Sequence, residues 1–369
     1  MANMMTTPIL NRPDGQLSAL ALRADPMEVV RVGFVGLGER GMKAVRRFCQ
    51  IDHARVAALC DVSEECRCQG AREVGSQGEQ EATVFANYED LCQSDDVDLV
   101  YVCTDWTSHV PIALCAMNSG KHVAIEVPAA TTLADCWTLV DTAERTRRHC
   151  TILENCCYAS HHLKTLAATR RGRMGTIVHV EGAYIHPMGD RWTPWRTEAN
   201  RQLRGDLYPT HGMGPACQLL GIHRSDWITS LVSMDTEPFL REDFRNGDHT
   251  TTLMRTRLGK TILLQHNVVD PHEYTRRYHV VGTKQSTESR DSTPHDVMSL
   301  RMDRRLVHCL HHGLPLDIDV YDLAEWCCLA ELGAMSMDNG NMPVEVPDFT
   351  RGHWNDVEGY RHAFAPADE

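Results

Sequence analysis

The 369-residue sequence has no long hydrophobic run: no stretch reaches the roughly 18 apolar residues that a membrane-spanning helix needs. An apolar stretch at residues 17–22 is short and is closely followed by Arg23 and Asp25, which does not fit the apolar core of a secretory signal. We therefore expect no membrane partner. We also expect a cytoplasmic location, or a periplasmic one if an export signal precedes this start.

Positive charge is scarce as well. The chain has 37 Lys and Arg against 50 Asp and Glu, a net charge of −13, whereas a protein that binds a phosphate backbone needs a basic face. We therefore expect no nucleic-acid partner. With 42% hydrophobic and 24% charged residues, the chain is typical of a globular protein, and its length suits two domains.

Motifs for metal binding are absent too. The sequence has no His-Glu-x-x-His motif and no paired Cys-x-x-Cys, so we expect no metal site. Its fifteen cysteines are an odd number, and many stand in apolar runs, where a free cysteine packs like a small hydrophobic residue. We interpret them as reduced thiols, which indicates a reducing compartment.

The first half of the chain repeats one pattern. After an arm at residues 1–28, apolar strand-like runs alternate with helix-length segments; the runs lie at residues 29–35, 55–60, 97–103 and 122–127. This alternation predicts βαβ units and a parallel sheet. We expect an α/β domain at residues 29–152.

After about residue 150 the pattern changes to strands with few helices between them, at residues 176–185, 227–234, 250–258, 261–269 and 278–281. Gly259 and Lys260 predict a hairpin turn between two of these strands. We expect residues 153–369 to form an α+β domain for substrate binding and oligomerisation. Its open sheet should be a mostly antiparallel meander, with two late helices, at 301–312 and 319–335, packed on it.

A glycine motif follows the first strand-like run and opens a helix. Gly36 permits the tight turn, Gly38 lets a pyrophosphate approach the backbone, and Gly41 allows the helix to pack closely on the strand. Asp61, at the end of the second run, can accept hydrogen bonds from an adenosine ribose and would repel a 2′-phosphate. These features predict a Rossmann domain that binds NAD rather than NADP, although Arg40 could hold a 2′-phosphate.

The glycine motif, the run Tyr101-Val102-Cys103-Thr104 and the segment at residues 121–128 resemble the Gfo/Idh/MocA oxidoreductases. In that superfamily the last segment usually carries Glu-Lys-Pro, whose lysine assists hydride transfer to or from an alcohol. This chain reads Glu126-Val127-Pro128 instead. A valine can neither relay a proton nor polarise a carbonyl. The chain therefore lacks the lysine that the ordinary dehydrogenase mechanism uses.

Further segments are similar to glycoside hydrolase family 109, the NAD-dependent α-N-acetylgalactosaminidases. The run Tyr-Pro-Thr-His-Gly is long and chemically unusual, and the matching segments span most of the chain, at residues 126–130, 153–158, 205–215, 271–276 and 313–317. The resemblance implies that the nicotinamide takes a hydride from C3 of a terminal N-acetylhexosamine, that a base removes the C2 hydrogen, and that the C1 substituent leaves. Water then adds at C1, and hydride return regenerates tightly bound NAD in each turnover.

The resemblance also implies where the ligands bind. It places the NAD contacts at Glu39, Arg40, Asp61, Trp106, Thr107, Ser108, His109, Glu126, Val127 and Asn155. It places the sugar contacts at Tyr184, Arg196, Tyr208, Pro209, Thr210, His211, Tyr274 and His295.

Four residues are candidates for proton transfer. Tyr208 and His211 are three positions apart in a Pro- and Gly-containing segment, and histidine, which titrates near neutrality, is the usual general base. The competing interpretation is that His211 only caps a helix. Tyr158 and Tyr274 are the other candidate acid/base or sugar-binding hydroxyls, and either could equally be an ordinary core or interface tyrosine.

Departures from the family leave alternatives open. Family members often carry His-Gly-Gly-Met-Asp where this chain reads His295-Asp296-Val297-Met298-Ser299, so the preferred hexosamine and its anomer are not fixed. A β-N-acetylhexosaminidase with the same redox cycle, an NAD-dependent sugar dehydrogenase and a non-enzymatic NAD-sensing protein are the competing functions. Superfamily resemblance further implies a homo-oligomer, a dimer or larger, paired through the open sheet.

Overall fold

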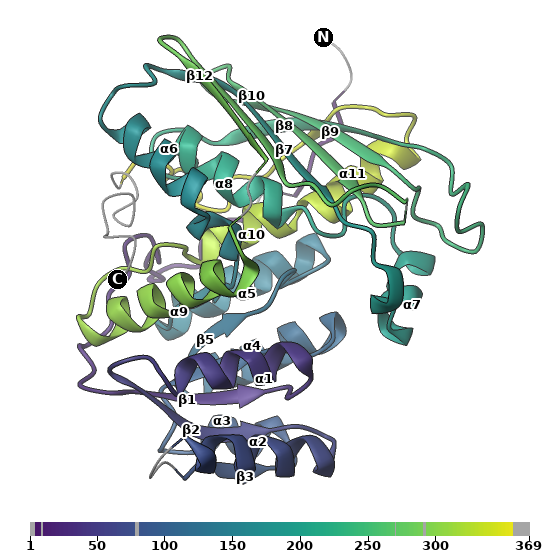
Figure 1. Cartoon of the computed structure of the whole chain (residues 1–369). Helices are drawn as coiled ribbons and strands as arrows, with labels where there is room; N and C mark the ends of the chain where they lie inside the picture. Colours follow the sequence, from purple (N-terminus) through teal and green to yellow (C-terminus); the bar gives the residue numbers. More distant parts are fainter. Residues whose placement is uncertain (1–3, 9, 78–80, 270, 291–292, 357–369) are drawn as a thin grey trace.

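The computed structural model describes residues 4–8, 10–77, 81–269, 271–290 and 293–356. Two sheets dominate it: a parallel sheet in the lower part of Figure 1 and a larger mixed sheet in the upper part, with helices between them. The parallel sheet ends at β6 and the mixed sheet begins at β7. The expected fold class, a Rossmann-type α/β domain followed by an α+β domain, is confirmed.

The parallel sheet has six strands in the order β3-β2-β1-β4-β5-β6. Their side chains are largely buried and rich in valine, which is typical of parallel strands covered on both faces. The strands are β1 (Val30–Val35), β2 (Ala54–Cys60), β3 (Thr83–Phe85), β4 (Leu99–Val102), β5 (His122–Ile125) and β6 (Cys150–Ile152). The sequence pattern predicted β1, β2, β4 and β5; β3 and β6, with three residues each, were missed.

Helices contact this sheet in two groups. One contains α1 (Glu39–Phe48), α2 (Glu64–Ser76) and α9 (His295–His311), and the other α3 (Tyr88–Gln93) and α4 (Trp106–Asn118), on which α5 (Leu133–Thr146) packs. The expectation that the helix near residues 301–312 packs on the antiparallel sheet is wrong. This helix, α9, contacts α1 and β1, and its buried Met302 and Leu306 belong to the main apolar core, which includes the strands of the parallel sheet.

The mixed sheet has seven strands in the order β12-β11-β7-β10-β9-β8-β13. They are β7 (Ile177–Ile185), β8 (Ile228–Asp235), β9 (Thr250–Thr256), β10 (Thr261–Asn267), β11 (Arg277–Gly282), β12 (Ser286–Arg290) and β13 (Val344–Glu345). Gly259 and Lys260 lie in the turn between antiparallel β9 and β10, as expected. The meander is a wrong prediction: β10 pairs with β7 in parallel, because β7 inserts between β10 and β11.

Two helices missed from the sequence lie between β7 and β8, and the second of them packs against β7 and β10 of the mixed sheet. They are α7 (Pro194–Gln202) and α8 (Thr210–Leu220), and α6 (Ser160–Arg170) packs on α8. Of the late segment expected as one helix at 319–335, α11 (Leu329–Asp338) contacts β8, whereas α10 (Val320–Cys327) contacts α5, β6 and α8. All eight residues of α10 are buried, so this helix fixes the two halves against each other.

The N-terminal arm lies on the body of the protein. Arg12 forms an ion pair with the buried Glu144 on α5 at 3.0 Å, and the hydroxyl of Tyr321 on α10 accepts the backbone N–H of Ala19 at 2.8 Å. All fifteen cysteines are free thiols. Within the described ranges, no helix combines the length and apolar character needed to cross a bilayer.

Candidate functional site

The glycine loop between β1 and α1 has the shape that a dinucleotide needs. Gly36 has a φ of +91°, and a Cβ at Gly41 would lie 1.9 Å from the carbonyl oxygen of Gly36, so neither position accepts a side chain. A Cβ at Gly38 would meet nothing within 4 Å. The loop is therefore closed on its inner side and open at Gly38, where the helix N-terminus can receive a pyrophosphate.

Asp61 fixes this loop. Its two carboxylate oxygens accept the backbone N–H groups of Leu37 at 2.6 Å and of Ser63 at 2.8 Å, and each oxygen keeps a second lone pair for a ribose hydroxyl. Arg40, the residue that could have held a 2′-phosphate, is held by Glu126 through two hydrogen bonds of 2.6 and 3.2 Å. The charges of this loop therefore fit NAD better than NADP.

A polar network follows β5 and β6 beside the glycine loop. Arg40 and the side-chain amide of Asn155 both donate to Nε2 of His295, each at 2.9 Å, and Asn155 also donates to Ser299 at 3.0 Å. Burial and the neighbouring Arg40 lower the pKa of His295 to about 3, so its imidazole is neutral and accepts these bonds. The structure thus places His295, a predicted sugar contact, among the predicted cofactor contacts.

The remaining predicted cofactor contacts differ in exposure. Glu39 begins α1 with an exposed side chain that pairs with Lys43 at 2.8 Å. His109 is buried, and its ring nitrogens lie 2.8 Å from the carbonyl oxygen of Pro128 and 3.1 Å from that of Thr104, so the ring fastens the loop after β5. Val127 packs against the core beside that loop.

Three predicted sugar-site residues form one aromatic group next to the Rossmann half. Tyr208 precedes α8, His211 lies in its first turn, and Tyr184 lies near the end of β7. The ring of Tyr184 lies 4.5 Å from that of His211 and 5.5 Å from that of Tyr208. Trp106, at the start of α4, contacts Tyr208 with ring centroids 5.1 Å apart. The structure therefore brings the predicted sugar residues and one predicted NAD contact together.

Arg196 and Tyr274 flank this aromatic group. Arg196, on α7, donates from Nε to the hydroxyl of Tyr208 at 3.2 Å and lies over the ring of Trp195 at 4.4 Å. Tyr274 is 46% exposed and reaches the group through His186, whose ring lies 4.7 Å from Tyr274. Groups of these kinds suit a sugar: a guanidinium and a phenol hydroxyl bind its polar groups, and aromatic faces pack on its C–H surface.

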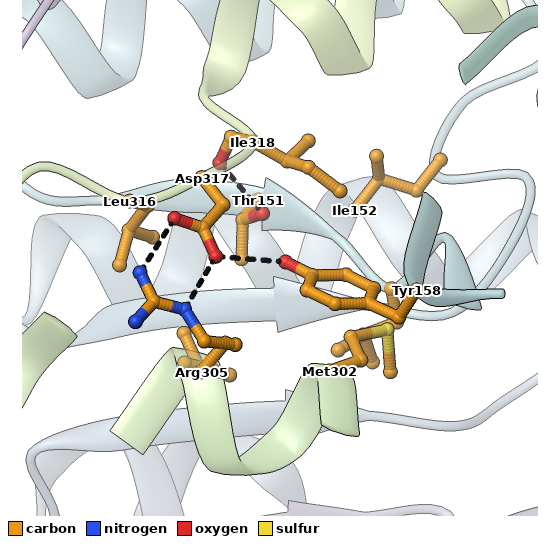
Figure 2. A pocket seen from close by; sticks show the side chains of 10 residues that line it. Thr151, Ile152, Tyr158, Met302, Arg305, Leu316, Asp317 and Ile318 are labelled. Carbon is orange, nitrogen blue, oxygen red and sulfur yellow. Dashed lines mark hydrogen bonds and ion pairs between the residues drawn. The ribbon is translucent and has the colours of Figure 1, made fainter. Parts of the chain in front are cut away.

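Tyr158 lies elsewhere. Its hydroxyl donates to Asp317 at 3.3 Å, and Arg305 donates two hydrogen bonds to the same carboxylate, at 2.9 and 3.0 Å (Figure 2). These side chains line a separate small pocket, and burial raises the pKa of Tyr158 well above its ordinary value. The structure does not bring Tyr158 to Tyr208 and His211; its contacts fit the alternative of a core tyrosine.

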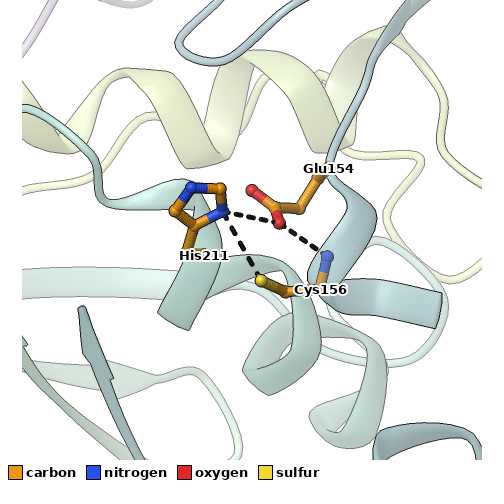
Figure 3. A group of neighbouring side chains, drawn as sticks. All are labelled: Glu154, Cys156 and His211. Atoms are coloured by element: carbon orange, nitrogen blue, oxygen red, sulfur yellow. Dashed lines mark hydrogen bonds and ion pairs between the residues drawn. The ribbon is translucent and has the colours of Figure 1, made fainter. Parts of the chain in front are cut away.

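The immediate partners of His211 were not predicted from the sequence. Nδ1 of His211 donates to Oε1 of Glu154 at 2.9 Å and lies 3.6 Å from Sγ of Cys156 (Figure 3). These three side chains have potential metal-ligand atoms within 4.8 Å of one another, the one such group within the described residues. The segment containing Glu154 was recognised as a matching motif, but only Asn155 and Tyr158 were named from it as candidate site residues.

Charge at this group differs from the sequence expectation. Burial alone lowers the pKa of His211, but the carboxylate of Glu154, with a smaller effect of Cys156, outweighs burial and raises this pKa to about 10. For Glu154, burial raises the pKa, and the imidazole of His211 outweighs it, so that the pKa falls below its ordinary value. His211 is therefore a protonated acid at neutral pH rather than a histidine that titrates near neutrality.

Two family models match the chain. The model of an oxidoreductase family with an NAD-binding Rossmann fold matches residues 30–153. The model of the glycosyl hydrolase 109 C-terminal domain matches residues 158–292 and 284–356. The first match identifies the parallel-sheet half as an NAD-binding Rossmann domain, and the second covers the aromatic group and the mixed sheet.

Curated relatives match over almost the whole chain. Glycosyl hydrolase family 109 protein 1 of Bacteroides fragilis is 44% identical over 434 aligned positions, which cover 97% of this chain and 93% of that protein. The glycosyl hydrolase family 109 protein of Porphyromonas gingivalis is 44% identical over 429 positions, covering 96% and 92%.

Solved structures share the fold at much lower identity. Scyllo-inositol dehydrogenase from Lactobacillus casei, with bound NAD(H) and scyllo-inositol, gives a TM-score of 0.74 at 17% identity and covers 86% of this chain and 99% of that chain. Levoglucosan dehydrogenase in complex with NADH and L-sorbose gives a TM-score of 0.73 at 14% identity and covers 87% and 100%. Both have the same succession of a Rossmann-like domain and a mixed-sheet domain.

Proposed function

The chain belongs to glycosyl hydrolase family 109, and on this premise we propose that it hydrolyses terminal α-linked N-acetylgalactosaminides by a cycle that requires NAD. The observation that carries the proposal is the contact of Tyr208 with Trp106, which joins the Tyr208–His211 group to the predicted NAD contacts. Val127 stands where related dehydrogenases usually carry a lysine, so this group is the best candidate for the proton transfers.

The dinucleotide would be held by the glycine loop, with the pyrophosphate at Gly38, the adenosine ribose at Asp61 and the nicotinamide near Asn155 and Glu126. Bound NAD would supply a reversible hydride acceptor, and oxidation of the sugar at C3 would make its C2 hydrogen acidic. We propose that the cofactor stays tightly bound and is regenerated in each turnover.

Proton transfer would then fall to the side chains of the chain itself. His211 is protonated at the start of the cycle and can donate its proton to the departing glycosidic oxygen. The neutral imidazole that results can then accept a proton from the water that adds at C1. Burial raises the pKa of Tyr208, and Arg196, which donates to its hydroxyl, only partly opposes this rise. A hydroxyl with a raised pKa is a stronger base once it is deprotonated. We assign removal of the C2 proton to Tyr208.

The faces of Tyr184 and Trp195 would pack on the C–H surface of the sugar, and Arg196 and Tyr274 would bind its polar groups. The same groups suit a β-linked substrate or another N-acetylhexosamine, so anomer and sugar are tested by a panel. Nitrophenyl glycosides of α- and β-linked N-acetylgalactosamine and N-acetylglucosamine should give the highest kcat/KM with the α-linked galactosaminide.

The test of the function is the release of nitrophenol from that substrate with no net NADH. Protein stripped of nicotinamide should lose the activity and regain it when NAD is added. Accumulation of NADH in proportion to sugar consumed would replace the proposal with a sugar dehydrogenase. Tight NAD binding without turnover of any sugar would replace it with an NAD-sensing protein.

We also propose a homo-oligomer formed through the open face of the mixed sheet. The strand register places Val232, Leu253 and Leu263 in one row across β8, β9 and β10, with Leu253 51% exposed. Leu253→Lys should reduce the mass measured by light scattering to that of a smaller assembly. An unchanged mass would place the interface elsewhere.

A further inference from the structure

The two ring nitrogens of His211 have different surroundings. Nδ1 is committed to Glu154 and lies near Cys156, as described above. Within the described chain, Nε2 has no hydrogen-bond partner. The ring lies against Tyr184 and beside a small pocket that Cys156 and Arg276 also line. An imidazole held by one nitrogen presents the other nitrogen in a fixed direction.

Glu154 is itself held in place. Its side chain is fully buried, and Oε1 also accepts the backbone N–H of Cys156 at 2.9 Å, which caps the short helix η1 (Asn155–Tyr158). Gly214, three residues after His211 on α8, makes room for it: a Cβ at this position would lie 3.0 Å from Cγ of Glu154. The backbones of η1 and α8 together thus fix the position of the Glu154 carboxylate beside His211.

We propose that Glu154 is a positioning residue, which holds Nδ1 of His211 and thereby fixes Nε2 as the atom that exchanges protons with the sugar. This inference rests on the proposed function, since it names the group that orients its acid. The pair works because a buried carboxylate needs a hydrogen-bonded cationic partner, and His211 is the charged group that contacts it.

Other titratable groups face His211 from the surrounding elements. They are Cys156 on η1, Tyr184 and His186 at the end of β7, Asp206 and Tyr208 before α8, His266 on β10, Arg276 before β11 and His295 on α9. Of these, only Cys156 shares the contact at Nδ1, so the effect of removing the Glu154 charge can be separated from theirs.

The test uses Glu154→Gln in the full-length protein, because the amide keeps the size of the side chain and removes its charge. We expect kcat to fall about 100-fold while KM stays within about twofold. The high-pH limb of the kcat profile should move to lower pH, because burial without the carboxylate favours neutral imidazole. Glu154→Asp, which keeps the charge, should retain more of kcat than Glu154→Gln.

A second readout does not depend on activity. In spectra of protein with ¹⁵N-labelled histidine, the signal that disappears in His211→Asn identifies His211, and in the wild type it should show a proton fixed on Nδ1. In Glu154→Gln the same signal should titrate at lower pH. If the wild type releases no nitrophenol, the proposed function fails, and this titration still decides the role of Glu154.

The molecule contains a matched control. Glu325 is also buried and lies 3.3 Å from a buried histidine, His223, away from the aromatic group. Glu325→Gln should change the melting temperature and leave kcat, KM and the pH profile of the folded enzyme unchanged. A profile that moves equally in both variants would overturn the proposal, as would a His211 signal that titrates unchanged in Glu154→Gln. A stoichiometric metal ion bound to Nδ1 of His211 would overturn it too.

Discussion

Among the described residues, two buried glutamate–histidine pairs differ in whether the histidine keeps a nitrogen accessible. In the first pair, His211 gives Nδ1 to Glu154 and keeps Nε2 uncommitted beside an aromatic group. In the second pair, His223 is fully buried, with Nδ1 3.8 Å from Asp322 and Nε2 3.3 Å from Glu325. The carboxylates outweigh burial and raise the pKa of both histidines to about 10.

A raised histidine pKa therefore does not mark an active site by itself. His223 and its neighbour Arg224 neutralise the carboxylates around α10, where Arg224 donates to Asp319 and Asp322 at 3.0 Å each. That arrangement ties the turn after α8 to α10, and complete burial leaves no nitrogen of His223 accessible to a ligand. His211 has the same charge but only one nitrogen engaged, and this difference separates a proton-transfer site from a structural ion pair.

The largest expected effects come from substituting the two histidines. His211→Ala should lower kcat by about 10²-fold or more, because it removes a group that transfers protons, while NAD remains bound. His223→Ala should instead lower the free energy of unfolding by about 3 kcal/mol, because it leaves buried carboxylates without their partner. Steady-state kinetics and urea unfolding separate the two results. A normal rate in His211→Ala would remove it from the acid/base role.

Smaller effects are expected from substituting two tyrosines, one in the aromatic group and one outside it. Tyr208→Phe should lower kcat by about tenfold or more, since it removes a hydroxyl placed among the sugar residues. Tyr158→Phe should leave kcat within about twofold and reduce the free energy of unfolding by about 1 kcal/mol, the value of its hydrogen bond to Asp317. Equal losses of kcat in both variants would return Tyr158 to the proton-transfer group.

Cofactor choice gives an effect of similar or smaller size. Glu126→Gln removes the charge that holds Arg40, so the guanidinium gains freedom to meet a 2′-phosphate, and the preference for NAD over NADP should fall about tenfold. Titration of both dinucleotides by calorimetry measures this ratio. An unchanged preference would assign the discrimination to Asp61 alone.

The smallest effects concern stability against pH. For His211 and His223, whose folded pKa is raised, stabilisation is complete below about 6.5 and is lost as pH rises through about 10. Burial lowers the pKa of His122, His149 and His266 to about 3, so their burial costs stability as pH falls from 6.5 to 3. For these histidines, urea unfolding should therefore give maximal stability near pH 6.5, with loss toward both higher and lower pH. His223→Asn should weaken the alkaline loss, and an unaltered alkaline limb would contradict the assignment.

Local features of the sequence predicted the parts of the site that are local in the chain. The Gly36–Gly41 turn and the proximity of Tyr208 to His211 follow from spacing of a few residues. Partners that depend on long-range packing were beyond such reasoning: Glu154 and His211 are 57 residues apart, and Tyr158 and Asp317 are 159 apart. The side on which α9 packs and the insertion of β7 beside β10 depend on the same tertiary contacts.

The central claim is that His211 and Tyr208 serve a cleavage that passes through exchange of the C2 proton of the sugar. Hydrolysis of an aryl α-N-acetylgalactosaminide in D₂O, followed by NMR of the released sugar, tests it directly. The account predicts deuterium at C2 in the product, with loss of both product and label in His211→Ala. Product that retains its full proton signal at C2 would show direct displacement at C1 and contradict the account.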